Sequence, residues 1–421
     1  MKLVSFKKCL VISAVLWLTG AGFNSHFLVG AVINEITLET FTTIQGAIND
    51  SNTLPGHRLR VEPGSYYENV TVNKASLTIT GYPYSQATVY GGAGNTFTIS
   101  ANNVSIQYLI ITTNGSYHGV KIDSGCTYNT IWGNTIQDCN RGVWVYSSHN
   151  TIRENDFQSC TWSLQVNSSD NIIYKNTFSD CDRGVYFYSS TSTGNVVCHN
   201  FFSDFATGVY LAFCSGNWVY SNIINGDANP QYGDHGITMA AANGNFIYGN
   251  TIKDCYYGLF MEYSNNNKIH HNNFMNNTTN HAYSYAGSGN TWDIGNAYGN
   301  YWSNASCTDS NSDGVCDSYY SIAGGSEQDP HPLVAAWYII KGNVNGDPLG
   351  NITISDISYL SYYLNTDPSC EPVTPCAADV NGDSVVDAND TTYLNNFLYL
   401  SGPAPVGNCE AQLVLPRSFK K

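Results

Sequence analysis

Charged residues are scarce in this 421-residue chain, and basic residues are the scarcer kind. Only 12% of the residues are Asp, Glu, Lys or Arg, and the 17 Lys and Arg leave a formal net charge of −15. Because phosphate binding requires clustered Lys and Arg, we expect no nucleic-acid partner. The excess of acidic residues instead suits solubility and the binding of divalent cations.

Long apolar runs are missing beyond the first 31 residues. Residues 1–31 begin with a basic stretch that ends at Lys8, continue with an apolar run from Cys9 to Leu18, and offer small residues for cleavage. The run is too short to span a bilayer, so we expect a signal peptide, with a membrane anchor as the alternative. We expect no membrane span after cleavage, and a secreted location, with the cell surface or the periplasm as variants.

Gly, Asn, Ser, Thr and Tyr are abundant, and Asn recurs in two series that indicate an internal repeat. The first series comprises Asn129, Asn150, Asn171, Asn195, Asn217, Asn245, Asn267 and Asn290. The second follows five residues later and comprises Asn134, Asn155, Asn176, Asn200, Asn222, Asn250 and Asn272. We expect these residues to adopt the left-handed conformation at bends and to hydrogen-bond along columns.

Each repeat contains short runs in which apolar and polar residues alternate, as at Gly142 to Val145. Such short strands cannot bury an apolar face alone, but coils stacked about 4.8 Å apart complete both the hydrogen bonds and the core. The repeat therefore predicts an all-β fold, a right-handed parallel β-helix over residues 32–305.

The cysteines fall into two groups. Cys139, Cys160 and Cys181 recur every 21 residues, and Cys255 has the same place in its repeat, which predicts stacked buried thiols. Cys307 with Cys316, and Cys370 with Cys376, flank loops in the last third of the chain, so these are the disulfide candidates in an oxidising compartment.

The start of the chain, the Asn repeats, the segment Gly299 to Ser303 and residues 328–333 resemble NosD-like proteins. These belong to a wider group of carbohydrate-binding and sugar-hydrolysis β-helices, and the resemblance covers roughly residues 35–335. It implies the fold but no single activity, because the group mixes lyases, epimerases, hydrolases and non-catalytic members.

Near the C-terminus, oxygen ligands stand at loop positions 1, 3, 5, 9 and 12, with a backbone carbonyl at 7, as seven-coordinate Ca²⁺ requires. These ligands are Asp379, Asn381, Asp383, Val385, Asp387 and Asp390. An imperfect upstream copy, with two extra residues, offers Asn343, Asn345, Asp347 and Asp356. A helix-like run follows each loop, and the pair resembles a type I dockerin over residues 340–400, which implies Ca²⁺ and a cohesin-like partner. Residues 401–421 form a tail.

A third acidic loop lies in the expected terminal segment, residues 306–339. Asp309, Asn311, Asp313 and Asp317 provide ligands at positions 1, 3, 5 and 9, but position 12 is not an acid. The loop is either another Ca²⁺ site or a solvated turn held by a Cys307–Cys316 disulfide.

Outward-facing residues at equivalent repeat positions form columns of arginine and aromatic side chains. The candidate substrate-binding residues are Arg141, Trp144, Trp162, Tyr186, Tyr210 and Phe260. Aromatic rings suit the C–H faces of sugars, and arginine binds carboxylates in a bidentate manner, so the columns predict an acidic polysaccharide ligand. Alternatively, the rings stack only to stabilise neighbouring strands.

Four residues beside these columns are candidates for catalysis. Asp180 and Asp204 have the same place in adjacent coils, and two carboxylates so close raise one pKa, as a general acid requires, or share a Ca²⁺. His235 follows Asp234 and is a candidate base, and Arg183 is the fourth candidate. The alternative is that Asp138, Arg141, Asp182 and Arg183 form ordinary surface ion pairs on turns and that His235 is an ordinary loop histidine.

Three functions stay open on these grounds. The first is a polysaccharide-processing enzyme, a lyase, epimerase or glycosidase acting on an acidic glycan. The second is a non-catalytic glycan-binding or cell-surface protein. The third is a NosD-like periplasmic copper-maturation factor, which is disfavoured because copper needs a convergent cluster of Cys, Met or His ligands and Met is scarce.

Overall fold

The computed structural model describes residues 30–81, 87–227, 233–295, 298–337, 352–365, 378–382, 386–400 and 402–405. The expected signal peptide lies almost wholly outside the described residues. So do the candidate ligands Asn343, Asn345, Asp347, Asp383 and Val385 and the candidate pair Cys370 and Cys376.

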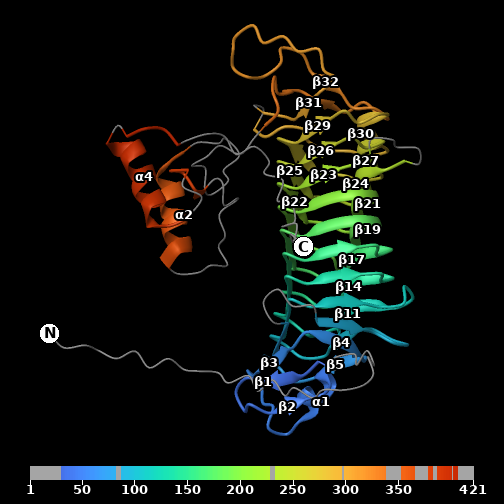
Figure 1. Cartoon of the computed structure of the whole chain (residues 1–421). Helices are drawn as coiled ribbons and strands as arrows, with labels where there is room; N and C mark the ends of the chain where they lie inside the picture. The colour runs from blue at the N-terminus through green and yellow to red at the C-terminus, as the bar shows by residue number, and fades with distance from the viewer. Residues whose placement is uncertain are drawn as a thin grey trace, which may run out of the picture.

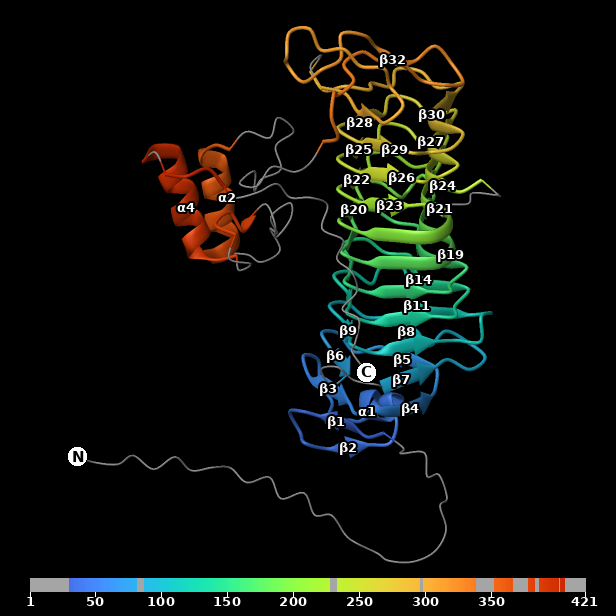
Figure 2. The same ribbon diagram turned by 45° about the horizontal axis from the view of Figure 1, so that its top comes forward.

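The described residues from 58 to 302 form the predicted right-handed parallel β-helix, in which successive coils stack along one axis, and two antiparallel strands within residues 32–41 extend its first sheet (Figures 1 and 2). A full coil adds one strand to a first sheet, sheet A, and two strands to a second sheet, sheet B. We call these two the leading and the trailing strand of sheet B, in chain order. Among the described residues sheet A has 12 strands and sheet B has 19.

Sheet A comprises, in spatial order, β2 (Thr40–Phe41), β1 (Val32–Asn34), β3 (Arg58–Val61), β6 (Thr78–Gly81), β9 (Ser105–Gln107), β12 (Thr130–Trp132), β15 (Thr151–Arg153), β18 (Ile172–Tyr174), β20 (Val196–Cys198), β22 (Trp218–Tyr220), β25 (Phe246–Tyr248) and β28 (Lys268–His270). The leading strands of sheet B are β4 (Gly64–Tyr67), β7 (Ala87–Tyr90), β10 (Ile110–Thr112), β13 (Thr135–Gln137), β16 (Asp156–Gln158), β23 (Ile223–Asn225), β26 (Thr251–Lys253), β29 (Asn273–Met275) and β31 (Tyr301–Trp302). The trailing strands are β5 (Val70–Val72), β8 (Phe97–Ile99), β11 (His118–Ile122), β14 (Arg141–Val145), β17 (Trp162–Val166), β24 (His235–Ala240), β27 (Tyr257–Glu262) and β30 (Asn280–Tyr285).

Two strands, β19 (Thr177–Tyr188) and β21 (Phe201–Ala212), run through both strand positions of sheet B. Helix α1 (Ile44–Asn49) lies near the N-terminal end of the β-helix, as expected from the run around Ile44. A two-stranded sheet of β32 (Tyr320–Ser321) and β33 (Gln328–Asp329) lies near the other end. Helices α2 (Ile354–Asn365) and α4 (Ala388–Tyr399) share a small separate core around Leu360 and Leu394.

The alternating residues form the core because equivalent positions pair in register from coil to coil. Ile131 pairs with Ile152, which pairs with Ile173, and all three side chains are fully buried. On the sheet B side, the rings of Phe157 and Phe178 stack with centroids 4.9 Å apart. Burial of one such column removes each apolar side chain from water, which an isolated three-residue strand cannot do.

The two Asn series form two buried ladders of hydrogen bonds. At Asn200, the backbone N–H and side-chain Nδ2 both donate to Oδ1 of Asn222, each at 3.0 Å, while its own Oδ1 accepts the same two donors from Asn176. The expected left-handed conformation is wrong for these asparagines, because it belongs instead to the residue before each one, such as His199 (φ 55°) and Ser221 (φ 53°). That preceding residue makes the bend, which leaves the Asn amide free to point inward.

Both ladders end on a carboxylate of the C-terminal segment. Nδ2 of Asn290 donates to Glu327 at 2.8 Å. The other ladder continues from Asn272 to Asn300, where Asp329 accepts from the backbone N–H of Asn300 at 2.7 Å and from Nε1 of Trp302 at 2.9 Å. Each ladder is a row of amide dipoles that point the same way, and its last asparagine has N–H groups to donate, so a negative charge at this donor end is favourable, as it is at a helix N-terminus.

The cysteine predictions are confirmed where the structure describes them. The four thiols of the repeat, at positions 139, 160, 181 and 255, are free and buried. Cys307 and Cys316 form a disulfide. No helix among the described residues is both long enough and apolar enough to cross a membrane.

A candidate binding face of arginines and aromatic rings

The outer face of the trailing strands carries the predicted columns, because the sheet pairs their members in register. One column contains Arg141, Trp162, Arg183, Thr207, His235 and Tyr257 in successive coils. The next contains Trp144, Gln165, Tyr186, Tyr210, Thr238 and Phe260. We call this surface the arginine–aromatic face.

Both columns extend one coil further at each end than the sequence indicated. His118 pairs with Arg141 at one end, and Phe260 pairs with Tyr283 at the other. The dipeptide Gly119-Val120 was an available signal for the first of these coils, since the same dipeptide opens the strand at Gly142.

Each arginine of the face is held between aromatic rings. The Cζ atom of Arg141 lies 4.2 Å from the ring centroid of Trp144 and 4.3 Å from that of Trp162. The Cζ atom of Arg183 lies 5.1 Å from the Trp162 centroid, 4.4 Å from Tyr186 and 4.9 Å from Tyr210. These are cation–π distances, so the rings partly replace water around each positive charge.

Neither guanidinium has a carboxylate partner in the part of the chain that the structure describes. No Asp or Glu there forms an ion pair with Arg141 or Arg183. The expectation of ordinary surface ion pairs therefore fails for both. Arg153 on sheet A provides the contrast, because it also stacks on a tryptophan, Trp132, at 4.1 Å, but its charge is paired with Glu154 at 2.7 Å.

Packing of the columns desolvates this surface although it faces outward. The Tyr186 side chain is only 6% exposed because neighbouring coils cover it. Burial lowers the pKa of Arg141, and burial together with the nearby Arg141 and Lys121 lowers the pKa of His118 to about 4. His118 is therefore neutral at physiological pH, and the positive charge of this region stays on the arginines.

The opposite end of the face is aromatic but has no arginine. The rings of Phe260 and Tyr283 stack with centroids 5.3 Å apart and planes 6° apart. Tyr257 lies beside both, with its centroid 5.1 Å from that of Phe260. Two residues after Phe260 in the same strand, Glu262 lies in a third column beside the two already described.

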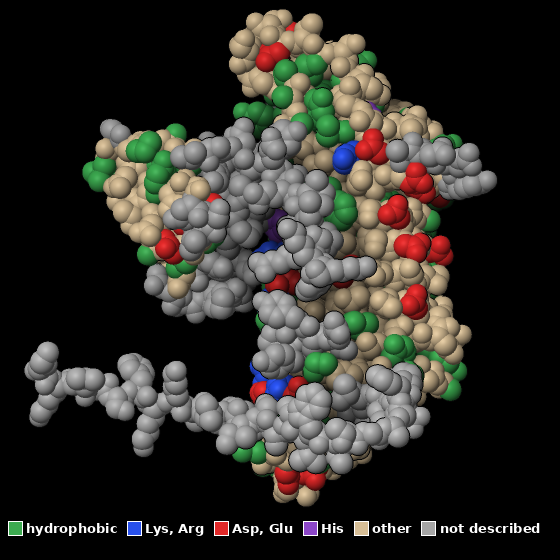
Figure 3. All heavy atoms as spheres, in the orientation of Figure 1, with side chains coloured by type: hydrophobic (Ala, Val, Ile, Leu, Met, Phe, Trp, Pro, Cys, Tyr) green, Lys and Arg blue, Asp and Glu red, His purple; other side chains and the backbone are tan. Residues whose placement is uncertain are grey.

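Asp180 and Asp204 have equivalent places in neighbouring coils, as predicted, since the residues on either side of them pair in register. Both have left-handed backbones (φ 52° and 51°), so they make the bend between the leading and trailing strands. The hydroxyl of Ser159 donates to Asp180 at 2.7 Å. The structure places no carboxylate of this pair in an ion pair with Arg183. Figure 3 shows acidic side chains, in red, down one side of the β-helix.

His235 lies in the arginine column, but its hydrogen-bond partner is a hydroxyl and not Asp234. Its Nδ1 lies 3.0 Å from Oγ1 of Thr238, and burial lowers its pKa. Burial and the nearby Asp227 and Asp204 raise the pKa of Asp234. The four catalytic candidates are thus distributed over several coils, since Arg183 and His235 are separated by the coil of Thr207.

In the C-terminal module, the last ligand of each predicted loop has the same structural position. Asp356 and Asp390 are the third residues of α2 and α4, and both side chains are fully buried. Asp390 accepts hydrogen bonds from the backbone N–H groups of Val380 at 2.8 Å and Asp387 at 2.9 Å. Asp356 accepts from the N–H of Thr353 at 2.8 Å. Each carboxylate therefore ties a loop to the start of its helix.

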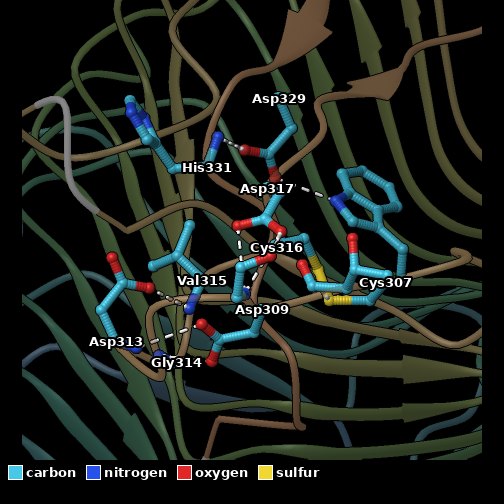
Figure 4. Close-up of a disulfide and its surroundings, with 12 residues drawn as sticks. Cys307, Asp309, Asp313, Gly314, Val315, Cys316, Asp317, Asp329 and His331 are labelled. Atoms are coloured by element: carbon cyan, nitrogen blue, oxygen red, sulfur yellow. Dashed lines mark hydrogen bonds between the residues drawn. A yellow bond between two sulfur atoms is a disulfide. The ribbon is translucent and has the colours of Figure 1, made fainter.

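The loop between the disulfide cysteines is ordered by its own carboxylates (Figure 4). Asp309 accepts from the N–H of Gly314 at 3.0 Å, and Asp313 accepts from the N–H of Val315 at 2.9 Å. The Ser310 hydroxyl and N–H lower the pKa of Asp317. Over the ranges that the structure describes, no three His, Cys, Asp or Glu side chains are grouped as a metal site. Calcium at Asp309 to Asp317 stays a prediction.

Comparison with protein families gives two matches. The family described as periplasmic copper-binding protein (NosD) matches residues 46–235 and 227–307. The dockerin type I domain matches residues 341–399. A cell surface glycoprotein of Methanothermus fervidus is 40% identical over 117 residues, which are 27% of this chain and 19% of that protein. The chain therefore spans about a fifth of the length of this curated relative.

Several solved structures are similar at low sequence identity. The A-module of mannuronan C-5 epimerase AlgE4 from Azotobacter vinelandii gives a TM-score of 0.45 at 13% identity, covering 59% of this chain and 89% of that one. The Dettilon tailspike protein gives 0.44 at 12% identity, covering 57% and 55%. A mannuronic acid-specific polysaccharide family 6 lyase from human gut microbiota gives 0.42 at 14% identity, covering 61% and 76%.

Proposed function

The chain belongs to the NosD family and carries a C-terminal dockerin type I domain, and we propose that it is an extracellular protein that binds an acidic polysaccharide on its arginine–aromatic face. The dockerin module attaches it to a cohesin partner. A position at the cell surface is in keeping with the name of its relative, a cell surface glycoprotein.

The observation that carries the proposal is the state of Arg141 and Arg183. A partly desolvated charge is costly unless it is compensated. The aromatic rings and, at Arg141, hydrogen bonds to the side-chain oxygens of Gln165 and Asn140 do so in part, but no described carboxylate forms an ion pair with either arginine. A uronic acid supplies the missing carboxylate, to which the guanidinium donates two parallel hydrogen bonds. The tryptophan and tyrosine rings around the arginines offer apolar surfaces for the sugar ring.

We expect Arg183→Ala to weaken binding of oligogalacturonate by about 10- to 100-fold, because it removes a charge-assisted hydrogen-bonding pair. Isothermal titration calorimetry on the purified full chain measures the change. Arg153→Ala is the matched control, since it removes an arginine that also stacks on a tryptophan but already has an acidic partner. Equal losses in the two variants, or a parent chain that binds no acidic glycan, would contradict the proposal.

Processing of the bound glycan is a second candidate function, and Asp234 favours it. The pKa of this carboxyl group is raised by burial and by the nearby Asp227 and Asp204, which is the condition that a general acid requires. Asp180, Asp204, Arg183 and His235 remain the proposed catalytic residues. Reducing ends and the absorbance of unsaturated products, followed during the same titrations, distinguish an enzyme from a binding protein.

Calcium is the proposed cofactor of the dockerin module. The donors of the second loop are oxygen atoms only, and its described members Asp379, Asn381, Asp387 and Asp390 would hold the ion together with Asp383 and Val385, which lie outside the described residues. When bound, the ion neutralises the carboxylates and fixes the loop against α4. The donor set therefore fits a hard divalent cation.

Calcium is expected to raise the melting temperature of the C-terminal module within the full chain. An ion present at 1,000 times its dissociation constant stabilises the folded state by about 4 kcal/mol. Calorimetry with Ca²⁺ and with chelator measures the effect, which Asp379→Ala should remove. Asp309→Ala, in the disulfide loop, is the control. A melting temperature of the module that changes with neither Ca²⁺ nor chelator would refute the assignment.

The described residues do not fit copper, the metal in the family's description. His270 and His271 are the adjacent histidine pair, and their Nδ1 atoms lie 2.9 Å from each other, so each ring uses this nitrogen on its neighbour. Burial lowers both pKa values. No described Cys, Asp or Glu groups with them as a third ligand. We therefore propose no copper-dependent function.

A further inference from the structure

The arginine–aromatic face changes its electrostatic character along the axis of the β-helix. Its first part, which we call the cationic part, contains Arg141 and Arg183 with the rings between them. Its second part, which we call the neutral part, contains Tyr257, Phe260 and Tyr283 and no basic residue. A ligand that lies along the columns therefore meets two different chemical environments.

In the cationic part, the spacing of the two arginines suits a sugar chain that runs along the axis. Arg141 and Arg183 are two coils apart, with Trp162 in the coil between them. Two coil spacings are about 10 Å, and an extended pyranose chain advances by about one coil spacing per residue. The two guanidinium groups thus face the carboxylates of every second residue, while Trp162, whose ring both guanidinium groups contact, lies between them.

In the neutral part, the nearby charges are negative. Glu262 is in the same strand as Phe260 and in the next outward column. Asp234 precedes the strand that pairs with that of Tyr257, and burial together with the nearby Asp227 and Asp204 raises its pKa. The negative charges would repel a uronate carboxylate over this part. An uncharged sugar ring is not repelled and contacts the stacked aromatic rings.

Resting on the proposed acidic-glycan function, we propose that the ligand is a mixed polysaccharide in which a uronic-acid-bearing segment adjoins neutral sugars. The uronate segment binds the cationic part, and the neutral sugars bind the neutral part about three coils further along the axis, which is about 14 Å. A uniform polyuronan fits only the first part, and a uniform neutral glycan only the second.

Titration calorimetry of the full chain in Ca²⁺ with three oligosaccharides tests this division. The probes are hexagalacturonate, xylohexaose and an aldopentaouronic acid, a xylotetraose that carries one glucuronic acid. The parent chain is expected to bind the aldopentaouronic acid more tightly than either uniform oligomer. Arg183→Ala should weaken the two acidic probes by about tenfold or more and leave xylohexaose unchanged, because only a carboxylate pairs with Arg183.

Phe260→Ala is expected to weaken xylohexaose and the aldopentaouronic acid and to spare hexagalacturonate. Phe246→Ala, which removes a ring stacked 4.1 Å from Trp218 on sheet A, is its matched control and should change none of the three. Glu262→Gln removes a repulsive charge without removing packing, so it should tighten hexagalacturonate by several-fold.

The outcomes separate the two proposals. If the parent chain binds none of the probes, both the proposed function and the division of the face are wrong. If Arg183→Ala abolishes binding while Phe260→Ala and Glu262→Gln change all probes alike, the face binds acidic glycans but has no neutral part, and only the present inference is overturned.

Discussion

Replacement of Asp329 by alanine is expected to destabilise the end of the β-helix by roughly 4 kcal/mol or more. The carboxylate is fully buried and accepts hydrogen bonds from the N–H and Nδ2 of Asn300, from Nε1 of Trp302 and from the N–H of His331. Each buried donor left without an acceptor costs about 1–3 kcal/mol. Denaturant unfolding measures the loss, and hydrogen exchange should place it near Asn300 first.

Glu327→Ala is the control, because Glu327 ends the other ladder but is only half-buried, so water replaces it at lower cost. A loss as large as that of Asp329→Ala would mean that burial of the ladder end is not the cause.

The same carboxyl group predicts a pH dependence. Burial raises the pKa of Asp329 to about 6, although its donors lower it. Because the folded pKa lies above the ordinary value of about 3.9, the folded state binds the proton more tightly. The stability contributed by this group is therefore fully present below about pH 4 and is lost as the pH rises through about 6, a difference of roughly 3 kcal/mol. Asp329→Asn should flatten this part of the stability curve.

Replacement of Asn200 in the middle of the second ladder is the other change with a large expected effect. Asn200→Ala removes the acceptor of the Asn176 N–H and the donor to the carbonyls of Ile173 and Cys198, all in a fully buried place. We expect a loss of roughly 3–5 kcal/mol, since several backbone groups lose their partners at once. That is a large fraction of the 5–15 kcal/mol typical of a folded domain.

Asn225→Ala is the matched control for this substitution. Asn225 ends the leading strand of the next coil, but its side chain faces outward and lies outside both ladders. Its loss should stay within about 0.5 kcal/mol. If both variants shift the unfolding midpoint alike, the Asn side chains stabilise the coil through strand propensity and not through the ladder.

Much of the binding face followed from the repeat alone. Once coils stack in register, residues at equivalent positions must lie one coil spacing apart, so the columns through Arg141, Trp162 and Arg183 could be assigned by counting. The dockerin module could be assigned in the same way, because its loop positions are set by local spacing. The residue that makes each bend could not, because intrinsic preference assigns the left-handed backbone to Asn, whereas the fold gives it to residues such as His199 and Ser221 and uses the Asn side chains in the ladders.

The sequence by itself determined the period of the β-helix, the faces on which its side chains lie, and the dockerin module, since each of these depends on residues within one or two repeats. Only the tertiary structure decided how the ladders end and which charges lack partners. Asp329 is 29 residues from Asn300, and Glu327 is 37 residues from Asn290, in a segment that does not repeat. That no described carboxylate forms an ion pair with Arg141 or Arg183 likewise depends on where the acidic side chains of the fold lie. Periodic spacing determines which residues are neighbours in adjacent coils. How a ladder ends, and whether a charge has a partner, depend on the whole chain.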